Sequence, residues 1–469
     1  MGSAEPSLAG PIDAVLAQVA ATRTVVTALE RLSSGASRET WRVETRSPDG
    51  DDASLVLQLG PVEATGLGLP TEVEAELLRA ARLRGVPVPD VVATGDANGP
   101  FGRPYLLTSF VQGEVLPQKV LRDPRLSQAL SGLAGEAGRA LAEIHRIEPN
   151  GSGLARSDPV TSARTVLDQL AETRPVLELA LLWLDERRPE SPAPVVVHGD
   201  FRLGNLIVDP AGLRAVVDWE LAHLGDPLED VAWAAIRAWR FDRHRPPDVF
   251  PDERAWIAAY EDARGACLDR DAYRWWAVAM TLRWAVICLV QSHRHLGGET
   301  SSVELAVIGR RVCESEWDLL GLTGAEMPAA GGPTGSRAGE PAGAAAAPVA
   351  RGQVGTEPGL YGSASAGVLA GAVRDLLAGE VRPAVTGRLR HEVRVAETAL
   401  AIVEREQRLS HALEECRAER LAPYGCASSA ELAALIRSGA LRYDEDLAAV
   451  LALEVRDELM VANPGWLDG

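Results

Sequence analysis

The sequence predicts an α+β fold in which a small sheet with one helix precedes a larger helical lobe and a separate bundle of helices. Strand-like segments fall between about residues 25 and 112, and helical periodicity dominates from about 113 to 322. A stretch rich in Ala, Gly and Pro then precedes a wholly helical C-terminal region. With 469 residues the chain is longer than one domain usually is, so we expect more than one domain.

The predicted sheet forms a small lobe at about residues 25–112. The segments "RLSSGASRETWRVET" and "ASLVLQLG" predict two strands, with a Gly/Ser turn inside the first. A helix follows, because Thr71 suits an N-cap, Glu74 comes three residues later and Gly85 suits a helix stop. The segments "VPVPDVVATG" and "RPYLLTSFV" predict further strands.

The remaining chain divides into three predicted parts. Residues 113–322 are mainly helical and complete a first domain that spans residues 1–322. Residues 323–362 contain few large apolar side chains and are predicted to form a flexible linker. Residues 363–469 repeat apolar side chains at helical spacing, for example in "EDLAAVLALEVRDELMVA", and predict a helical bundle.

Composition limits the partners that the chain is expected to bind. Its net charge of −19 argues against nucleic acid or an anionic membrane as the main partner. The five cysteines are widely spaced and predict free thiols, and the N-terminal residues do not resemble a signal peptide, so we expect a cytoplasmic protein. An apolar stretch centred on Arg283 predicts a buried helix rather than a membrane span.

The stretch "VVVHGDFRLGNLIVDPAGLRAVVDWELAHLGDP" concentrates polar groups at the ends of predicted strands. Folding "NLIVD" against "LRAVVD" about the intervening Pro-Ala-Gly turn brings Asn205 close to Asp218. Asp200 lies five residues before Asn205, within reach of the same point. Carboxylate and amide oxygens suit Mg²⁺, and an Asp beside a hydroxyl, with an Asn and an Asp on the metal, suits phosphoryl transfer.

These motifs resemble those of the aminoglycoside phosphotransferase-like small-molecule kinases. The similarity is greatest to the branch of kinase domains found beside acyl-CoA dehydrogenases. It covers roughly residues 10 to 322 and rests on the segments "HGDFRLGN", "DWE", "GDPLED", "GVPVPDVV" and "LAEIHRI".

The resemblance implies a protein-kinase-like bilobal fold and a role for each motif residue. Asp200 would be the catalytic base, His198 would orient its loop, and Asn205 and Asp218 would bind Mg²⁺. Asp226 and Asp230 would support the loop from the following helix.

The nucleotide would be held by the small lobe. The turn residues Ser34, Gly35 and Ser37 fit a phosphate-covering loop, although an ordinary hairpin turn has the same composition. By resemblance, Ser109 and Val111 at the end of the last predicted strand also contribute to the nucleotide site.

One part of the nucleotide site is missing from the sequence. The family normally places a Lys or Arg on the next strand, paired with a Glu on the following helix. Gln58 occupies that strand position, so Glu74 lacks its usual cation. Three explanations are open: Arg38 or Arg42 supplies the cation, the alignment of the strand is shifted, or the protein is a weak kinase or nucleotide sensor.

The predicted function is ATP- and Mg²⁺-dependent phosphorylation of a hydroxyl on a small-molecule metabolite. By resemblance alone, a hydroxyacyl-CoA is the leading candidate for the acceptor. The alternatives are a nucleotide-binding pseudokinase that docks a partner enzyme, and a kinase of aminoglycoside-type antibiotics. The C-terminal helices resemble a domain of uncharacterised role and predict a protein partner or self-association.

A group of tryptophans that includes Trp233 and Trp239 is predicted to pack in the core. A role in binding a ligand is the alternative for this group.

Overall fold

The computed structural model describes residues 8–19, 24–32, 38–61, 68–149, 153–190, 192–240, 252–328 and 365–468. The chain divides into two compact units, and each combines separate segments. The first unit contains Met1–Asp158 and Pro189–Ala277, and the second contains Pro159–Arg188 and Val278–Gly469. The predicted domains follow chain order (1–322, 323–362 and 363–469), and those boundaries stay predictions.

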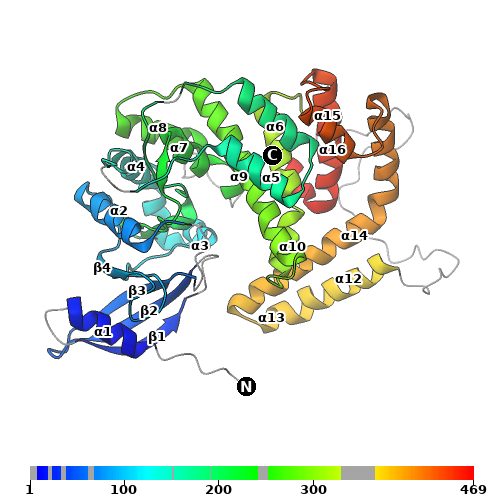
Figure 1. Ribbon diagram of the computed structural model, residues 1–469. Helices are drawn as coiled ribbons and strands as arrows, with labels where there is room; N and C mark the ends of the chain where they lie inside the picture. The colour runs from blue at the N-terminus through cyan, green and yellow to red at the C-terminus, as the bar shows by residue number, and fades with distance from the viewer. Residues whose placement is uncertain are drawn as a thin grey trace. The chain divides into compact units, whose positions relative to one another are not determined.

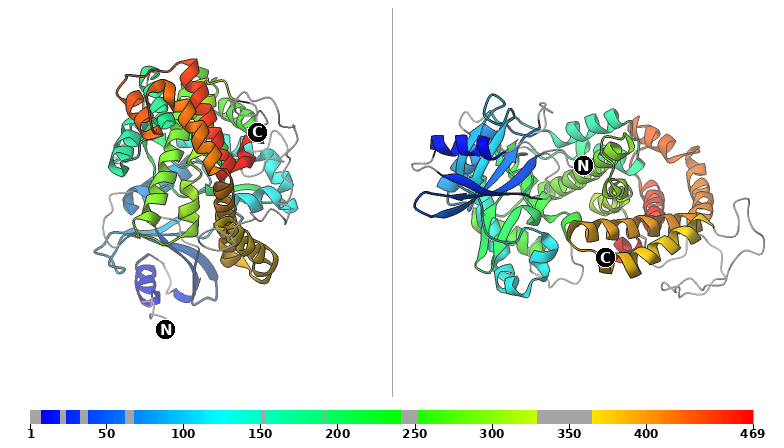
Figure 2. Two further views of the ribbon diagram at one scale, coloured as in Figure 1. Left: turned by 90° about the vertical axis from the view of Figure 1, so that its right-hand side faces the viewer. Right: turned by 90° about the horizontal axis from the view of Figure 1, so that it is seen from below.

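The first unit begins with the predicted β-rich lobe. Its five strands pair in the order β1-β2-β3-β5-β4, and all the pairs are antiparallel. Helix α1 lies against one face of this sheet (Figures 1 and 2). The elements are α1 (Ala9–Val19), β1 (Val25–Arg31), β2 (Glu39–Arg46), β3 (Asp52–Leu59), β4 (Val91–Gly95) and β5 (Tyr105–Ser109).

The alternation of side chains along β3 explains how this sheet is covered. Leu55, Leu57 and Leu59 are buried and pack in one cluster with Ile12 and other apolar residues of α1. Gln58 lies between two of these leucines and therefore belongs to the opposite face of the strand. The sequence predicted β2, β3, β4 and β5, but neither β1 nor α1, which covers the apolar face.

Helix α2 (Thr71–Leu83) confirms the predicted helix but corrects its N-terminus. Pro70 occupies the N-cap position, and the Thr71 hydroxyl donates to the Gly95 carbonyl oxygen at 3.2 Å. The predicted capping box is therefore wrong, and Glu74 is buried instead of closing the helix end. Gly85 has φ +80° and follows the end of the helix as predicted.

The rest of the first unit is mainly helical, with short strands that carry the polar motif. Strand β6 pairs with β9, and β7 pairs with β8. The elements are α3 (Pro117–Arg122), α4 (Ser127–Ile144), β6 (Val195–Val197), η2 (Leu203–Asn205), β7 (Leu206–Asp209), β8 (Gly212–Val216), β9 (His223–Gly225), α7 (Pro227–Ala235), α8 (Glu253–Arg264) and the start of α9 (Arg270–Leu296). This unit confirms the predicted combination of a small sheet with a helical remainder.

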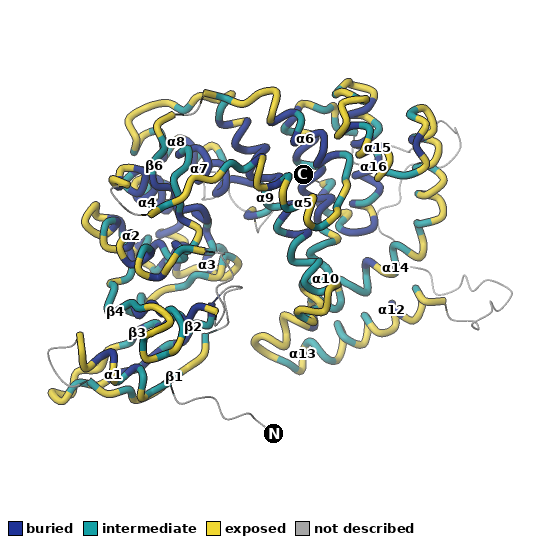
Figure 3. The backbone as a smooth tube through the Cα atoms, in the orientation of Figure 1, coloured by how far each residue is buried: buried dark blue, intermediate teal, exposed yellow. Residues whose placement is uncertain are grey.

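The second unit is entirely helical in its described residues. Helix α12 runs beside α14, which is 35 residues long, and most of both helices is exposed or half-buried (Figures 1 and 3). The elements are α5 (Pro159–Leu170), α6 (Pro175–Glu186), the rest of α9, α10 (Val303–Gly309), α11 (Val312–Thr323), α12 (Ala366–Leu376), η4 (Leu377–Val381), α13 (Arg382–Ala384), α14 (Gly387–Leu421), α15 (Ser429–Arg437) and α16 (Glu445–Ala462). Most of the predicted linker lies outside the described residues.

Helix α9 contains the apolar stretch around Arg283. Among the described residues it is the one helix long and apolar enough to cross a membrane, and 67% of its apolar window is buried within the protein. Such burial is typical of a core helix. The five cysteines are free thiols, as predicted.

The core of the sheet provides a first prediction. Replacement of the fully buried Leu57 by Ala removes apolar contacts and leaves a cavity. We expect Leu57→Ala to lower the free energy of unfolding by about 2–5 kcal/mol, measured by urea unfolding. The matched control is Leu83→Ala, at a side chain 90% exposed, for which we expect a change within about 0.5 kcal/mol. Equal effects of the two variants would contradict this account of the core.

Candidate active site

The loop that follows β6 depends on a glycine. Gly199 has φ +78°, and a Cβ atom at this position would overlap the carbonyl oxygen of Leu221. The preceding His198 is fully buried, and its Nδ1 accepts the Asp200 N–H at 3.2 Å. Burial lowers the pKa of His198, against the opposing effect of Asp230 and Asp200. The ring is therefore held neutral in an interior position under the loop, where the resemblance predicted an orienting residue.

Asp200 is held by side-chain donors on both carboxylate oxygens. Its Oδ1 accepts the indole N–H of Trp233 at 2.7 Å, and its Oδ2 accepts the amide of Asn205 at 2.6 Å. Arg202 also donates from Nε, at 3.0 Å to Oδ1. The carboxylate therefore has a defined orientation, although it lies on a loop between two strands.

Asp230 anchors the same loop to helix α7. Its carboxylate accepts the backbone N–H groups of His198 at 2.7 Å and Gly199 at 2.9 Å. Burial alone would raise the pKa of Asp230, but the hydrogen bond and charge of His145 help to hold it below the usual range. Asp226 accepts the Leu228 N–H at 2.9 Å and caps α7. Both predicted supporting residues therefore lie at the start of α7, and Asp230 contacts the loop directly.

A chain of buried polar groups continues from Asp230. The Nε2 of His145 lies 3.2 Å from Asp230, and its Nδ1 lies 2.7 Å from the Tyr260 hydroxyl. Arg264 donates to the same hydroxyl at 3.0 Å. Since Arg264 can only donate, the Tyr260 hydroxyl accepts that bond. The motif "LAEIHRI" thus includes a residue, His145, that supports the loop through Asp230.

The β7–β8 hairpin places Asn205, just before β7, beside the end of β8, two residues before Asp218. Leu206 pairs with Val216, and the Val217 N–H donates to the Asn205 carbonyl oxygen at 3.0 Å. This is the register that the sequence predicted. Asp218 itself has φ +69°, an uncommon conformation for a residue other than glycine.

Asp218 lies in a concentration of negative charge. Burial, followed by the charges of Glu220, Asp200 and Glu74, raises the pKa of Asp218 to about 7. Such a group is costly to ionise without a cation. Within the described ranges, no group of three or more His, Cys, Asp or Glu side chains could hold a metal ion by itself. Asn205 and Asp218 fit instead a Mg²⁺ ion whose remaining ligands would be water and phosphate oxygens.

Arg38, just before β2, forms the ion pair with Glu74 that Gln58 cannot form. The guanidinium is buried and donates from Nη1 to Glu74 at 2.5 Å. Its Nε lies 3.4 Å from Glu220, in the segment that follows Asp218. An ion pair with the α2 glutamate is therefore present, and its cation comes from the residue just before β2 rather than from β3.

The other residues predicted to bind the nucleotide have separate positions. Arg42 pairs with Glu44 at 2.6 Å and stacks on Phe110, so it does not replace the missing cation. Ser109 exchanges two hydrogen bonds with Asp90, each 2.8 Å long, and Val111 is half-buried just beyond β5. The predicted phosphate-turn residues Ser34, Gly35 and Ser37 lie outside the described residues.

Arg202 and Trp233 were not predicted as site residues. Arg202 lies over the Trp239 ring at 4.9 Å, and a side chain at position 204 would overlap its guanidinium, so Gly204 leaves room for it. Trp233 was predicted to pack in the core. It is buried, but its indole N–H is directed at Asp200. The sequence signal for this role was the position of Trp233 in the helix that directly follows the polar motif.

Comparison with known proteins settles the family. Residues 28–276, more than half of the chain, match the model of the phosphotransferase enzyme family. The chain belongs to this family. Residues 383–466 match a second family, a domain of unknown function.

Two curated relatives connect this phosphotransferase with proteins named after acyl-CoA dehydrogenases. Acyl-CoA dehydrogenase family member 10 of Mus musculus is 29% identical over 317 residues, which are 59% of this chain and 28% of the mouse protein. Human acyl-CoA dehydrogenase family member 11 is 30% identical over 32% of this chain and 20% of its own length. The matches thus span about a quarter of these relatives. They confirm the predicted branch.

Two further comparisons concern antibiotic kinases. Viomycin phosphotransferase of Streptomyces vinaceus is 30% identical over 34% of this chain and 59% of its own length. A crystal structure of a Ralstonia eutropha protein, provisionally assigned as an aminoglycoside phosphotransferase, matches with a TM-score of 0.52. It is 23% identical and covers 66% of this chain and 97% of the other. This structural match confirms the kinase-like fold.

The contacts of Asp230 provide a second prediction. In Asp230→Asn an amide N–H₂ group replaces one of two oxygens that accept buried backbone donors. We expect a loss of about 1–3 kcal/mol in the free energy of unfolding, measured by urea unfolding. In the matched control Asp252→Asn a single oxygen caps α8, where Asn serves equally well, so stability should be nearly unchanged. The anchoring role is refuted if the two variants unfold alike.

Proposed function

We propose that this phosphotransferase transfers the γ-phosphoryl group of ATP, with Mg²⁺, to a hydroxyl group of a small-molecule metabolite. The observation that carries the proposal is the fixed carboxylate of Asp200, which shares a hydrogen bond with Asn205. Asn205 in turn lies beside the strand that leads to Asp218. A base and two oxygen ligands are thereby grouped at one end of a hairpin.

Asp200 would accept the proton of the acceptor hydroxyl. The acceptor oxygen forms a bond to phosphorus as the bond between phosphorus and the oxygen of ADP breaks, and the proton passes to the carboxylate. Trp233 and Asn205 already orient that carboxylate, so little reorganisation is needed during the reaction. Positioning of this kind is the main contribution that a protein makes to phosphoryl transfer.

Asn205 and Asp218 would hold the magnesium ion. The Asn205 amide donates to Asp200 through its nitrogen, which leaves its oxygen available as a ligand. The raised pKa of Asp218 supports a site that requires positive charge. A magnesium ion held by these two residues would supply positive charge against the negative charge that develops on the transferred phosphoryl group.

Arg38 would carry out the task usually given to the strand cation. It pairs with Glu74 and lies near Glu220, so its position is fixed from two sides. A charged donor is about twice as strong as a neutral one such as Gln58. This pair is the feature that favours an active kinase over a nucleotide-binding pseudokinase.

The acceptor we propose is a hydroxyacyl-CoA. Support comes from the relatives named as acyl-CoA dehydrogenases, of which this chain matches only a part. The match to viomycin phosphotransferase supports antibiotic phosphorylation as a second candidate. Both candidates use the same base and metal ligands, so the acceptor alone distinguishes them.

Substitution of Asp200 tests the proposed chemistry. Turnover of ATP should be measured with hydroxyacyl-CoA thioesters, simple hydroxylated metabolites, viomycin and aminoglycosides. We expect Asp200→Asn to lower kcat by roughly 10²–10⁴ on the productive acceptor, because the base is lost. Asp209→Asn is the matched control, since Asn can also accept the Ala211 N–H in the hairpin turn. Nucleotide binding without turnover on any acceptor would leave the pseudokinase as the explanation.

The role of Arg38 is tested first by removing its charge and then by placing a charge at position 58. We expect Arg38→Met to lower kcat/KM for ATP by roughly two orders of magnitude, because a charged contact worth about 2–3 kcal/mol is lost. Arg42→Met, in the adjoining strand β2, should change kcat/KM less than about threefold, since Arg42 pairs with Glu44.

The double variant Arg38→Met/Gln58→Lys returns a cation to the usual strand position. It should recover at least part of the lost kcat/KM. Full activity of Arg38→Met, or equal effects of Arg38→Met and Arg42→Met, would show that Arg38 does not contact the nucleotide.

A further inference from the structure

We propose that the C-terminal domain, residues 365–468, is an intramolecular docking module whose partner is the pair of helices α6 and α11 earlier in the same chain. Helix α6 lies within the phosphotransferase match, whereas α15 and α16 lie within the match to the domain of unknown function. All four helices belong to the second unit, in which α15 packs against α6 and α16 against α11. The proposal assigns a role to the C-terminal domain and does not depend on the acceptor of the kinase.

Helix α6 requires a partner on more than one side. Its buried residues include Val176, Leu177, Leu179, Ala180 and Leu181, which together point in all directions around the helix. Helices α5 and α11 cover part of this surface, and α15 covers another part. A helix that is apolar all round cannot leave one face in water without a large loss of stability.

The C-terminal helices present a matching apolar surface. In α15 Leu432, Ala433 and Ile436 are fully buried, and they recur at helical spacing. In α16 Leu451 and Leu459 are almost fully buried. Their burial, together with that of α6, is typical of a core that the C-terminal domain shares with the helices it contacts.

Ion pairs give this contact its specificity. Arg437, in the last turn of α15, contacts Asp168 of α5 at 2.6 Å. It also lies 3.9 Å from Glu178, a fully buried carboxylate of α6 that is held on its other oxygen by Arg164. A buried carboxylate is stable only with compensating charge, so α15 contributes to the stability of α6.

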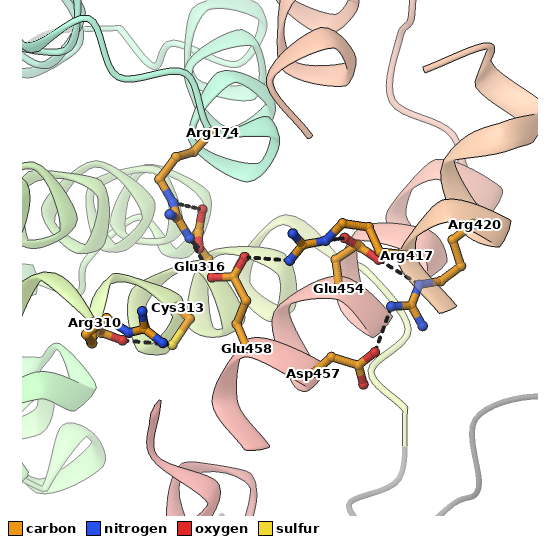
Figure 4. Close-up of polar contacts among 9 residues, drawn as sticks. All are labelled: Arg174, Arg310, Cys313, Glu316, Arg417, Arg420, Glu454, Asp457 and Glu458. Atoms are coloured by element: carbon orange, nitrogen blue, oxygen red, sulfur yellow. Dashed lines mark hydrogen bonds and ion pairs between the residues drawn. The ribbon is translucent and has the colours of Figure 1, made fainter. Parts of the chain in front are cut away.

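A second set of ion pairs joins α16 to α11 (Figure 4). Arg174, at the start of α6, contacts Glu316 of α11 at 2.6 Å and Glu458 of α16 at 2.7 Å. One guanidinium from within the phosphotransferase match therefore bridges a carboxylate of α11 and one of the C-terminal domain. Arg420 extends the set within the C-terminal domain through Glu454 and Asp457.

The end of the chain completes the contact. The Asn463 side chain donates to Glu314 at 2.8 Å, and the Trp466 indole donates to Asp318 at 3.3 Å. Both acceptors belong to α11. The acidic side chains Glu314, Glu316 and Asp318 thus meet donors from the C-terminal domain and from Arg174. Such complementarity specifies one partner surface.

The test keeps the full chain and cuts it after folding. A recognition site for a specific protease is inserted between residues 340 and 350, and the purified protein is cleaved there. We expect the two fragments to elute together on size-exclusion chromatography at micromolar concentration. Separation of wild-type fragments that both keep their helical circular dichroism would overturn the proposal.

Charge variants show whether the named contacts hold the fragments together. Arg437→Glu should weaken association of the cleaved protein at least about fivefold, because it loses Asp168 and repels Glu178. The double variant Asp168→Arg/Arg437→Glu should restore part of the affinity. The matched control Arg388→Glu reverses a side chain that is 81% exposed and pairs within α14, and it should have no effect. Equal effects of Arg437→Glu and Arg388→Glu would contradict the proposed contact.

Hydrogen exchange on the uncut chain gives an answer if a fragment aggregates. Amides of α6 and α15 should lose protection together in Arg437→Glu and keep it in Arg388→Glu. Unchanged protection of α6 in Arg437→Glu would overturn the proposal.

Discussion

The catalytic loop depends on one carboxylate that satisfies two backbone donors. The N–H groups of His198 and Gly199 point into the interior, and Asp230 accepts both. Because Asp230 stands in the first turn of α7, the loop is fixed to a helix rather than to its own short strands. The same helix carries Trp233, which orients Asp200. The support of the loop and the orientation of Asp200 therefore both come from helix α7, which suits the proposed reaction because phosphoryl transfer depends on positioning.

The sequence predicted those parts of the fold and site that follow from local spacing. The hairpin register was predictable because Asn205 and Asp218 flank a short turn, and alternation marked the strands of the small lobe. Arg38 could not be decided from the sequence, because its pairing with Glu74 spans 36 residues and depends on how α2 meets the sheet. Thr71 could not be assigned from local spacing, because its hydroxyl donates to the Gly95 carbonyl oxygen, 24 residues away, and does not cap its own helix. Trp233 was treated as core because indole burial and indole hydrogen bonding look alike in a sequence.

The ion pair between Arg38 and Glu74 indicates which feature of the proposed nucleotide site matters. The requirement is a positive charge held against Glu74, and the strand that supplies it is secondary. Arginine suits this position just before β2, since its several donors contact Glu74, Glu220 and the Leu69 carbonyl oxygen at once. A lysine at position 38 would offer one point charge for the same three acceptors. The neutral Gln58 on β3 and the charged Arg38 before β2 are therefore best understood together. The positive charge near Glu74 comes from position 38 instead of position 58.

The second unit raises the question of why an interface with so much apolar surface also uses buried ion pairs. Apolar contact alone would tolerate a shift of α15 along α6, since leucine and alanine side chains repeat at similar spacing along both helices. Arg437 removes that freedom, because only one register brings it to both Asp168 and Glu178. Arg174 does the same for α11 and α16 by requiring Glu316 and Glu458 at one point. The ion pairs then contribute mainly to the position of the helices, while the apolar surface supplies most of the stability.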